Sequence, residues 1–163
     1  MTKSNKNQQD LRKNEVAIEV PAQRDAELIY IGQIKTPFET LYDCPRQGDK
    51  EQGPLCYIEV FAPWSEALDG IERYDTLDIL YWLHFSRRDL LKQTPNKDGN
   101  LLSTFSIRSP IRPNPIGVST VKLVKKNNNI LTVCGLDCLN MTPLIDIKPT
   151  FKLHSSARHS TQN

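Results

Sequence analysis

The chain has 163 residues and carries 21 Lys and Arg against 19 Asp and Glu, which gives a formal net charge of +2. Hydrophobic residues make up 38% of the sequence, and the mean hydropathy is −0.49. These values exclude collagen-like, mucin-like and wholly disordered chains, and the length is that of one domain. The small net charge does not by itself indicate a nucleic-acid-binding protein.

Neither a membrane span nor a secretory signal is visible in the sequence. The longest apolar run, Ile79 to Leu83, is far shorter than the roughly 20 residues that a transmembrane helix needs. The first twenty residues are polar and contain no apolar stretch of the kind found in signal peptides. We therefore expect a cytoplasmic protein that does not enter a membrane.

The cysteines and histidines do not form a metal-binding pattern. No C-x-x-C pair occurs, and the three histidines do not complete a zinc motif. We expect no bound metal and reduced thiols at all four cysteines, which are Cys44, Cys56, Cys134 and Cys138.

The first half of the chain begins with a polar segment, residues 1–26, which predicts a flexible tail with a short helix around Asp10–Val20. Apolar runs separated by Pro and Gly then predict strands over 28–34 and 55–61, joined by a long loop. Residues 64–74 are expected to hold one or two helical turns. The continuous apolar run 77–85 predicts a strand buried on both faces, with a short buried helix as the alternative.

The second half continues the pattern of short strands. Strands are expected over 101–107, 118–124, 130–133 and 144–147, and Asn-rich residues 125–129 predict a hairpin turn because Asn tolerates positive φ. Residues 153–163 are polar and are expected to be a disordered tail. About seven short strands, long loops and little helix predict an all-β protein, a barrel or a sandwich, in a single domain over residues 27–152.

The densest group of functional side chains is the Pro-rich segment Arg108–Gly117, R-S-P-I-R-P-N-P-I-G. Its three prolines fix φ and remove backbone donors, so the segment can be neither a helix nor a central strand. It is therefore expected to be a stiff loop that presents two guanidinium groups, a hydroxyl and an amide, as binding loops on β scaffolds do. A purely structural connection is the alternative.

This segment and three others resemble the motifs of the TsaA-like domain family, the family of the tRNA N6-adenosine methyltransferases. Cys44–Gln47 resembles an early P-R-Q motif, Ile79–His84 a central strand that ends in histidine, and Thr142–Pro149 a terminal T-P-x-x-D-I-K-P motif. The four motifs stand in the family's order, and the resemblance covers roughly residues 27–151. Asn140-Met141 and Thr150 differ from the Asp-Gly and the aromatic residue that the family commonly has there.

The resemblance implies a small β-barrel that binds S-adenosylmethionine and forms a homodimer. It also implies methylation of N6 of threonylcarbamoyladenosine at position 37 of tRNA. Transferred to this sequence, the cofactor-binding residues would be Pro45, Arg46, Gln47, His84, Arg108, Val118, Cys134, Gly135, Leu136 and Asp137. The candidates for the substrate side are Arg112, Asn114, Asp146 and Lys148.

The chemistry of these residues agrees with methyl transfer, in which the protein mainly orients donor and acceptor. Arg46 and Arg108 are suited to a carboxylate, and Asp137 to ribose hydroxyls or an ammonium group. Leu136 or Val118 would cover the adenine. The general base is left open.

Three residues are candidates for that base: His84, Asp137 and Asp146. A buried core histidine is the alternative for His84, and an ion pair with Lys148 is the alternative for Asp146.

RNA binding would require further basic and aromatic surface. The candidates are Lys122, Lys125, Lys126, Lys148 and Lys152 with Tyr42, Phe105 and Phe151, and a solvated hairpin is the favoured reading of Lys125-Lys126. Two other functions remain open: a methyltransferase for a different acceptor, and a non-catalytic S-adenosylmethionine-binding module.

Overall fold

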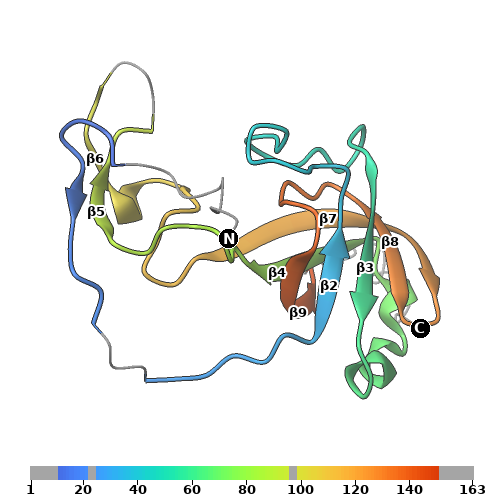
Figure 1. Cartoon of the computed structure of the whole chain (residues 1–163). Coiled ribbons are helices and arrows are strands. Elements are labelled where there is room, and N and C mark those ends of the chain that lie inside the picture. The colour runs from blue at the N-terminus through green and yellow to red at the C-terminus, as the bar shows by residue number, and fades with distance from the viewer. Residues whose placement is uncertain (1–10, 22–24, 96–98, 151–163) are drawn as a thin grey trace, which may run out of the picture.

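A computed structural model describes residues 11–21, 25–95 and 99–150 of the protein. In these residues nine strands and three short 3₁₀ helices form a closed six-stranded barrel and a three-stranded sheet beside it (Figure 1). The prediction of an all-β protein built on a small barrel with little helix is confirmed.

The barrel is antiparallel between all neighbouring strands. It closes because β2 pairs with β3 on one side and with β9 on the other. In order around the barrel the strands are β2 (Gly32–Lys35), β3 (Leu55–Val60), β8 (Ile130–Cys134), β7 (Ile116–Asn127), β4 (Thr76–Trp82) and β9 (Thr142–Pro149).

Alternation of side chains along the strands places the hydrophobic core inside the barrel. Along β4, Leu77, Ile79 and Tyr81 are buried, and along β3, Cys56 and Ile58 are buried, while their neighbours face outward. A period of two in burial is the pattern of a strand with one face on the core. Removal of this apolar surface from water is the main stabilisation of the barrel.

The expected hairpin between β7 and β8 is present and its turn is tighter than predicted. The strands extend to Asn127 and from Ile130, so the turn consists of Asn128 and Asn129. Asn128 has a φ of 52°, the left-handed conformation that asparagine adopts more readily than most residues.

The second sheet consists of β1 (Val16–Ala17), β5 (Leu90–Gln93) and β6 (Leu102–Ser103). The predicted helix around Asp10–Val20 is therefore wrong in its described part. Val16 pairs with Lys92, and the N–H of Ile18 donates to the carbonyl of Asp89 at 2.8 Å, so this segment's backbone is committed to a sheet. The domain limits at residues 27 and 152 stay predictions, and residues 1–10 and 151–163 lie outside the described residues.

Two further segments differ from the prediction. The 77–85 run forms a strand only as far as Trp82, because the chain turns there. The N–H of His84 donates to the carbonyl of Trp82, and the N–H of Ser86 donates to the carbonyl of Leu83. The strand is buried on one face and half-buried on the other. The expected strand 101–107 is limited to β6. It is followed by a 3₁₀ turn, η3 (Thr104–Ser106), in which side-chain hydroxyls bond to backbone carbonyls.

The remaining helical structure is two 3₁₀ segments, η1 (Trp64–Leu68) and η2 (Ile71–Arg73), where one or two turns were expected. Within the described ranges, no helix has the length and apolar character to cross a membrane.

Candidate functional site

One cavity of about 1780 Å³ gathers most of the residues that the sequence motifs single out. Its walls come from the loop before β3, the turn after β4, the Pro-rich loop with the start of β7, and the segment after β8. The predicted residues that line it are Pro45, Arg46, Gln47, His84, Arg108, Arg112, Val118, Gly135 and Asp137. Those that do not line it are Asn114, Cys134, Leu136, Asp146 and Lys148.

The loop that carries Pro45, Arg46 and Gln47 rests on the segment after β8 through two glycines. A Cβ on Gly48 would lie 1.8 Å from the carbonyl oxygen of Gly135, so no larger residue fits without moving the loop. Gly135 itself has a φ of 114°, a conformation that side-chain-bearing residues rarely adopt. The thiol of Cys134 lies 2.9 Å from the carbonyl oxygen of Gly53. The close contact of these backbones brings Arg46 and Asp137 to one cavity.

Asp137 is held by two side chains from inside the barrel. Its Oδ1 accepts hydrogen bonds from the hydroxyl of Tyr81 at 2.5 Å and from Oγ of Ser119 at 2.8 Å. Burial and the negative charge of Asp137 raise the pKa of Tyr81 well above its usual value, so its phenol stays protonated as a donor. Gly117 makes room for the ring, since a Cβ there would lie 2.1 Å from it.

The Pro-rich loop is anchored by Gln93, which the sequence analysis missed. The Gln93 side chain is buried, and its Nε2 donates to Oγ1 of Thr104 at 2.7 Å and to the carbonyl of Ile111 at 2.9 Å. Its Oε1 accepts from the hydroxyl of Ser109 at 2.6 Å. Gln93 stands in the short run L-L-K-Q, which belongs to no motif, so only its hydrogen bonds identify it as the anchor.

Two predicted substrate residues brace the same loop. Arg112 Nη1 donates to the carbonyl of Ile107 at 2.8 Å, and its guanidinium lies over the ring of Phe105. Asn114 Oδ1 accepts from Arg88, whose Nε also donates to the carbonyl of Pro113. Arg108 is exposed, and no side-chain hydrogen bond or ion pair holds it within the described part of the chain.

His84 and Cys44 are two further titratable groups at the cavity. Burial lowers the pKa of His84, against a smaller opposite effect of the Trp82 backbone, so the imidazole is neutral near pH 7. Burial, and then the charges of Asp137 and Asp43, raise the pKa of Cys44 to about 11. The Cys44 thiol is therefore protonated and is not an activated nucleophile.

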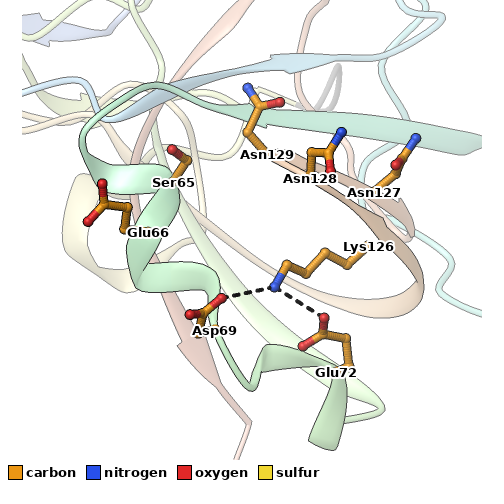
Figure 2. Close-up of a pocket in the computed structure, with 8 residues that line it drawn as sticks. All are labelled: Ser65, Glu66, Asp69, Glu72, Lys126, Asn127, Asn128 and Asn129. Carbon is orange, nitrogen blue, oxygen red and sulfur yellow. Dashed lines mark hydrogen bonds and ion pairs between the residues drawn. The ribbon is translucent and has the colours of Figure 1, made fainter.

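Asp146, Lys148 and Lys126 form ion pairs outside the cavity. Lys148 Nζ and Asp146 Oδ2 are 2.5 Å apart on β9. This is the ion pair that was the alternative to a functional role for Asp146. On the hairpin side of the barrel, Lys126 points at Asp69 and Glu72, as Figure 2 shows, at 3.5 and 3.1 Å. This surface of the barrel is therefore not a free basic face.

The other candidates for RNA contact are divided. Lys122 lies 3.3 Å from Glu51, whereas Lys125 is exposed on β7. Tyr42 is 99% exposed and Phe105 is 76% exposed, and of the two only Phe105 lines the cavity. Lys152 and Phe151 lie outside the described residues. In the described ranges no three His, Cys, Asp or Glu side chains are grouped as metal ligands would be.

Comparison with known families gives a match over most of this structure. The family described as tRNA-methyltransferase O N-terminal domain, TrmO_N, matches residues 33–154. The chain belongs to this family. The TrmO_N match begins inside β2 and includes every motif segment on which the resemblance rested.

Among curated relatives, the probable S-adenosyl-L-methionine-binding protein VirR of Rhizobium radiobacter is 52% identical over 139 residues. That alignment covers 85% of this chain and 79% of VirR. The tRNA (adenine(37)-N6)-methyltransferase of Escherichia coli is 33% identical over 129 residues, covering 73% of this chain and 55% of that enzyme.

Solved structures agree with the family. A crystal structure of TrmO aligns with a TM-score of 0.67 and 29% identity, covering 85% of this chain and 64% of TrmO. TrmO from Pseudomonas aeruginosa aligns with a TM-score of 0.65 and 27% identity, covering 85% and 62%. The chain thus spans less than two thirds of the length of these TrmO chains.

Proposed function

We propose that this TrmO_N protein is an S-adenosylmethionine-dependent methyltransferase that acts on tRNA, at N6 of threonylcarbamoyladenosine 37. The observation that carries the proposal is the convergence of three separate motifs on one cavity, at Arg46, His84 and Arg108, beside Asp137. Relatives named as S-adenosyl-L-methionine-binding proteins support the cofactor, and the E. coli relative supports the tRNA substrate.

The cavity fits this cofactor in size and in chemistry. Its volume of about 1780 Å³ exceeds the roughly 300–1,000 Å³ of typical small-molecule sites, so space for an acceptor nucleotide remains. The exposed guanidinium groups of Arg46 and Arg108 are suited to a carboxylate, and Asp137 is suited to hydroxyl or ammonium donors. Val118, which is 44% exposed in the cavity wall, offers apolar surface to the adenine.

Cys134 and Leu136 would contribute through their backbone. The Leu136 side chain is 1% exposed and belongs to the barrel core, and Cys134 is also buried. Neither side chain faces the cavity, so a role in cofactor binding would fall to their N–H and C=O groups.

The cofactor supplies an activated methyl group and its own leaving group, and the chain's task is to orient the reactants and take up a proton. Two of the three base candidates line the cavity. His84 is neutral near pH 7 and can accept a proton, and Asp137 is oriented by Tyr81 and Ser119. Asp146 is paired with Lys148 outside the cavity wall, which favours the other two.

A homodimer and a cytoplasmic location are part of the proposal. The family resemblance supports the dimer, and the location is the one that modification of tRNA would require.

The test is methylation of tRNA by the purified protein, read by mass spectrometry of nucleosides, together with nucleoside profiles of cells that have or lack the gene. We expect N6-methylated threonylcarbamoyladenosine with the wild-type protein, and at least a tenfold loss of cofactor affinity and activity in Arg108→Ala. Arg73→Ala is the matched control, because Arg73 is exposed on η2 and does not line the cavity. Equal effects of the two substitutions would refute the assignment of Arg108.

A non-catalytic S-adenosylmethionine-binding module is the second candidate, because VirR and several archaeal relatives are named only for binding this compound. Calorimetry separates the two functions. Cofactor binding without methylation of any tRNA would establish the module, and methylation of a different nucleoside would establish a methyltransferase with another acceptor.

A further inference from the structure

The cavity has a second wall that the family motifs do not supply. Arg12 and Glu15, from the segment that leads into β1, line it together with Gln93 and Thr94 at the end of β5. This N-terminal segment precedes the part of the chain matched by TrmO_N, which begins at residue 33. It reaches the cavity because β1 pairs with β5 beside the barrel, as Figure 1 shows.

Hydrogen bonds of Arg12 and Glu15 hold the segment against the end of β5. Oε1 of Glu15 accepts the backbone N–H of Thr94 at 3.0 Å and its hydroxyl at 3.2 Å, and Oε2 accepts the N–H of Arg12 at 2.9 Å. Arg12 Nη1 donates to the carbonyl of Thr94 at 2.7 Å. These four bonds fix both side chains at the cavity wall.

Arg12 keeps most of its binding capacity. A guanidinium has five N–H donors, and within the described ranges only the bond to Thr94 uses them, with no ion pair. Of the other cavity arginines, Arg87 is bound at two nitrogens by Asp89 and Arg112 is bound to loop carbonyls. Arg46 and Arg108 are exposed and have no such bonds within the described ranges. Arg12, Arg46 and Arg108 are therefore the cavity arginines best prepared to bind an anion.

The position of Arg12 distinguishes it from the cofactor residues of the barrel. Arg46, Gly135 and Asp137 belong to the barrel and its loops, whereas Arg12 is fixed beside the small sheet, to which Gln93 also anchors the loop that carries Arg108. An RNA substrate presents a phosphate at every nucleotide, and arginine binds phosphate in two-pronged geometry.

We infer that Arg12 is part of the RNA-binding surface and binds a backbone phosphate beside the nucleotide in the cavity. This inference rests on the proposed function, because it assigns the substrate side of that same site.

The test uses the full-length protein and an anticodon stem-loop RNA that carries threonylcarbamoyladenosine 37. Binding is measured between 50 and 300 mM KCl for wild type, Arg12→Gln and Lys13→Gln. Lys13 is the matched control, since it is an exposed cation one residue away that does not line the cavity. We expect Arg12→Gln to weaken RNA binding about tenfold and to reduce the slope of log K against log salt by about 0.7. We expect Lys13→Gln to change neither, and both variants to bind S-adenosylmethionine as the wild type does.

A second variant tests whether the hydrogen bonds of Glu15 position Arg12. Glu15→Ala keeps the charge of Arg12 and removes its anchor, so we expect a similar loss of RNA affinity. Wild-type affinity in Glu15→Ala would show that the bonds of Glu15 to Thr94 and to the Arg12 backbone do not position Arg12.

Equal RNA affinity and salt slope in Arg12→Gln and Lys13→Gln would overturn the inference while leaving methylation intact. Loss of S-adenosylmethionine binding in Arg12→Gln would also overturn it, because Arg12 would then belong to the cofactor site. Failure of the wild-type protein to bind the RNA would instead refute the proposed function.

Discussion

At the scale of single residues, the site depends on a carboxylate whose orientation is set from inside the barrel. Tyr81 and Ser119 come from adjacent strands, β4 and β7, and their hydroxyls are 2.8 Å apart, so both reach Oδ1 of Asp137. Such a network restricts the carboxylate to one position. Asp137 thereby meets a ligand without first having to be ordered.

Removal of the Tyr81 hydroxyl tests this positioning role. We expect Tyr81→Phe to reduce S-adenosylmethionine affinity several-fold and the free energy of unfolding by about 1 kcal/mol, because one buried hydrogen bond is lost. Calorimetry and urea unfolding measure the two effects. Tyr57→Phe is the control, since Tyr57 is 47% exposed on the outer face of β3. A loss of stability with unchanged affinity would make the network purely structural.

Met141 occupies a backbone conformation that suits glycine. Its φ is 65°, and it stands where the family resemblance places a glycine, before β9. The left-handed conformation costs a side-chain-bearing residue roughly 1–2 kcal/mol. We expect Met141→Gly to raise the free energy of unfolding by about 1 kcal/mol, because the Met141 side chain is half exposed and contributes little packing.

Urea unfolding of Met141→Gly and Asn128→Gly provides the comparison. Asn128 has a similar φ of 52°, but asparagine tolerates this conformation better, so the gain there should be smaller. A destabilised Met141→Gly would show that the Met141 side chain packs more favourably than its exposure indicates.

At the scale of elements, the loop before β3 is held by close backbone contact rather than by a strand or a helix. Gly48 lies against Gly135, and the thiol of Cys134 contacts the carbonyls of Asp49 and Gly53. Since Pro45, Arg46 and Gln47 directly precede Gly48, their position in the cavity depends on this contact.

A single methyl group on Gly48 is expected to displace the loop. We predict that Gly48→Ala lowers S-adenosylmethionine affinity at least tenfold while the barrel stays folded, as measured by calorimetry and thermal unfolding. Gly99→Ala is the comparison, because Gly99 has a φ of 78° but no atom within 4 Å of an added Cβ. It should cost about 1 kcal/mol of stability through backbone strain and leave affinity unchanged. Wild-type affinity in Gly48→Ala would separate the loop from the cofactor site.

At the scale of the whole molecule, local sequence patterns were sufficient for most strands of the barrel, and the resemblance supplied the barrel itself. The apolar runs that form β3 and β4 and the asparagine turn after β7 are short-range signals, and they predicted elements that the structure contains. The motif residues that line the cavity could also be predicted, because the resemblance rests on contiguous segments of the sequence.

Long-range partners could not be predicted in this way. The pairing of Val16 with Lys92 joins two segments far apart in sequence, and a two-residue strand has no periodicity to detect. The anchoring role of Gln93 and the ion pair between Asp146 and Lys148 likewise arise only when the chain is folded. For Asp146 an ion pair with Lys148 was already the stated alternative, because a charge in an apolar strand requires a partner.

The small sheet has a consequence for how this protein is divided into parts. β5 and β6 share only two residue pairs, and a hairpin of that size is not stable alone, so β1 is a needed third strand. Yet β1 lies upstream of residue 33, where the family match begins. The segment that matches the family begins at residue 33, whereas the part of the chain that folds together includes β1 at residues 16 and 17. A fragment cut just ahead of β2 would keep all six barrel strands and expose one edge of β5 as an unpaired strand, open to pairing with other chains.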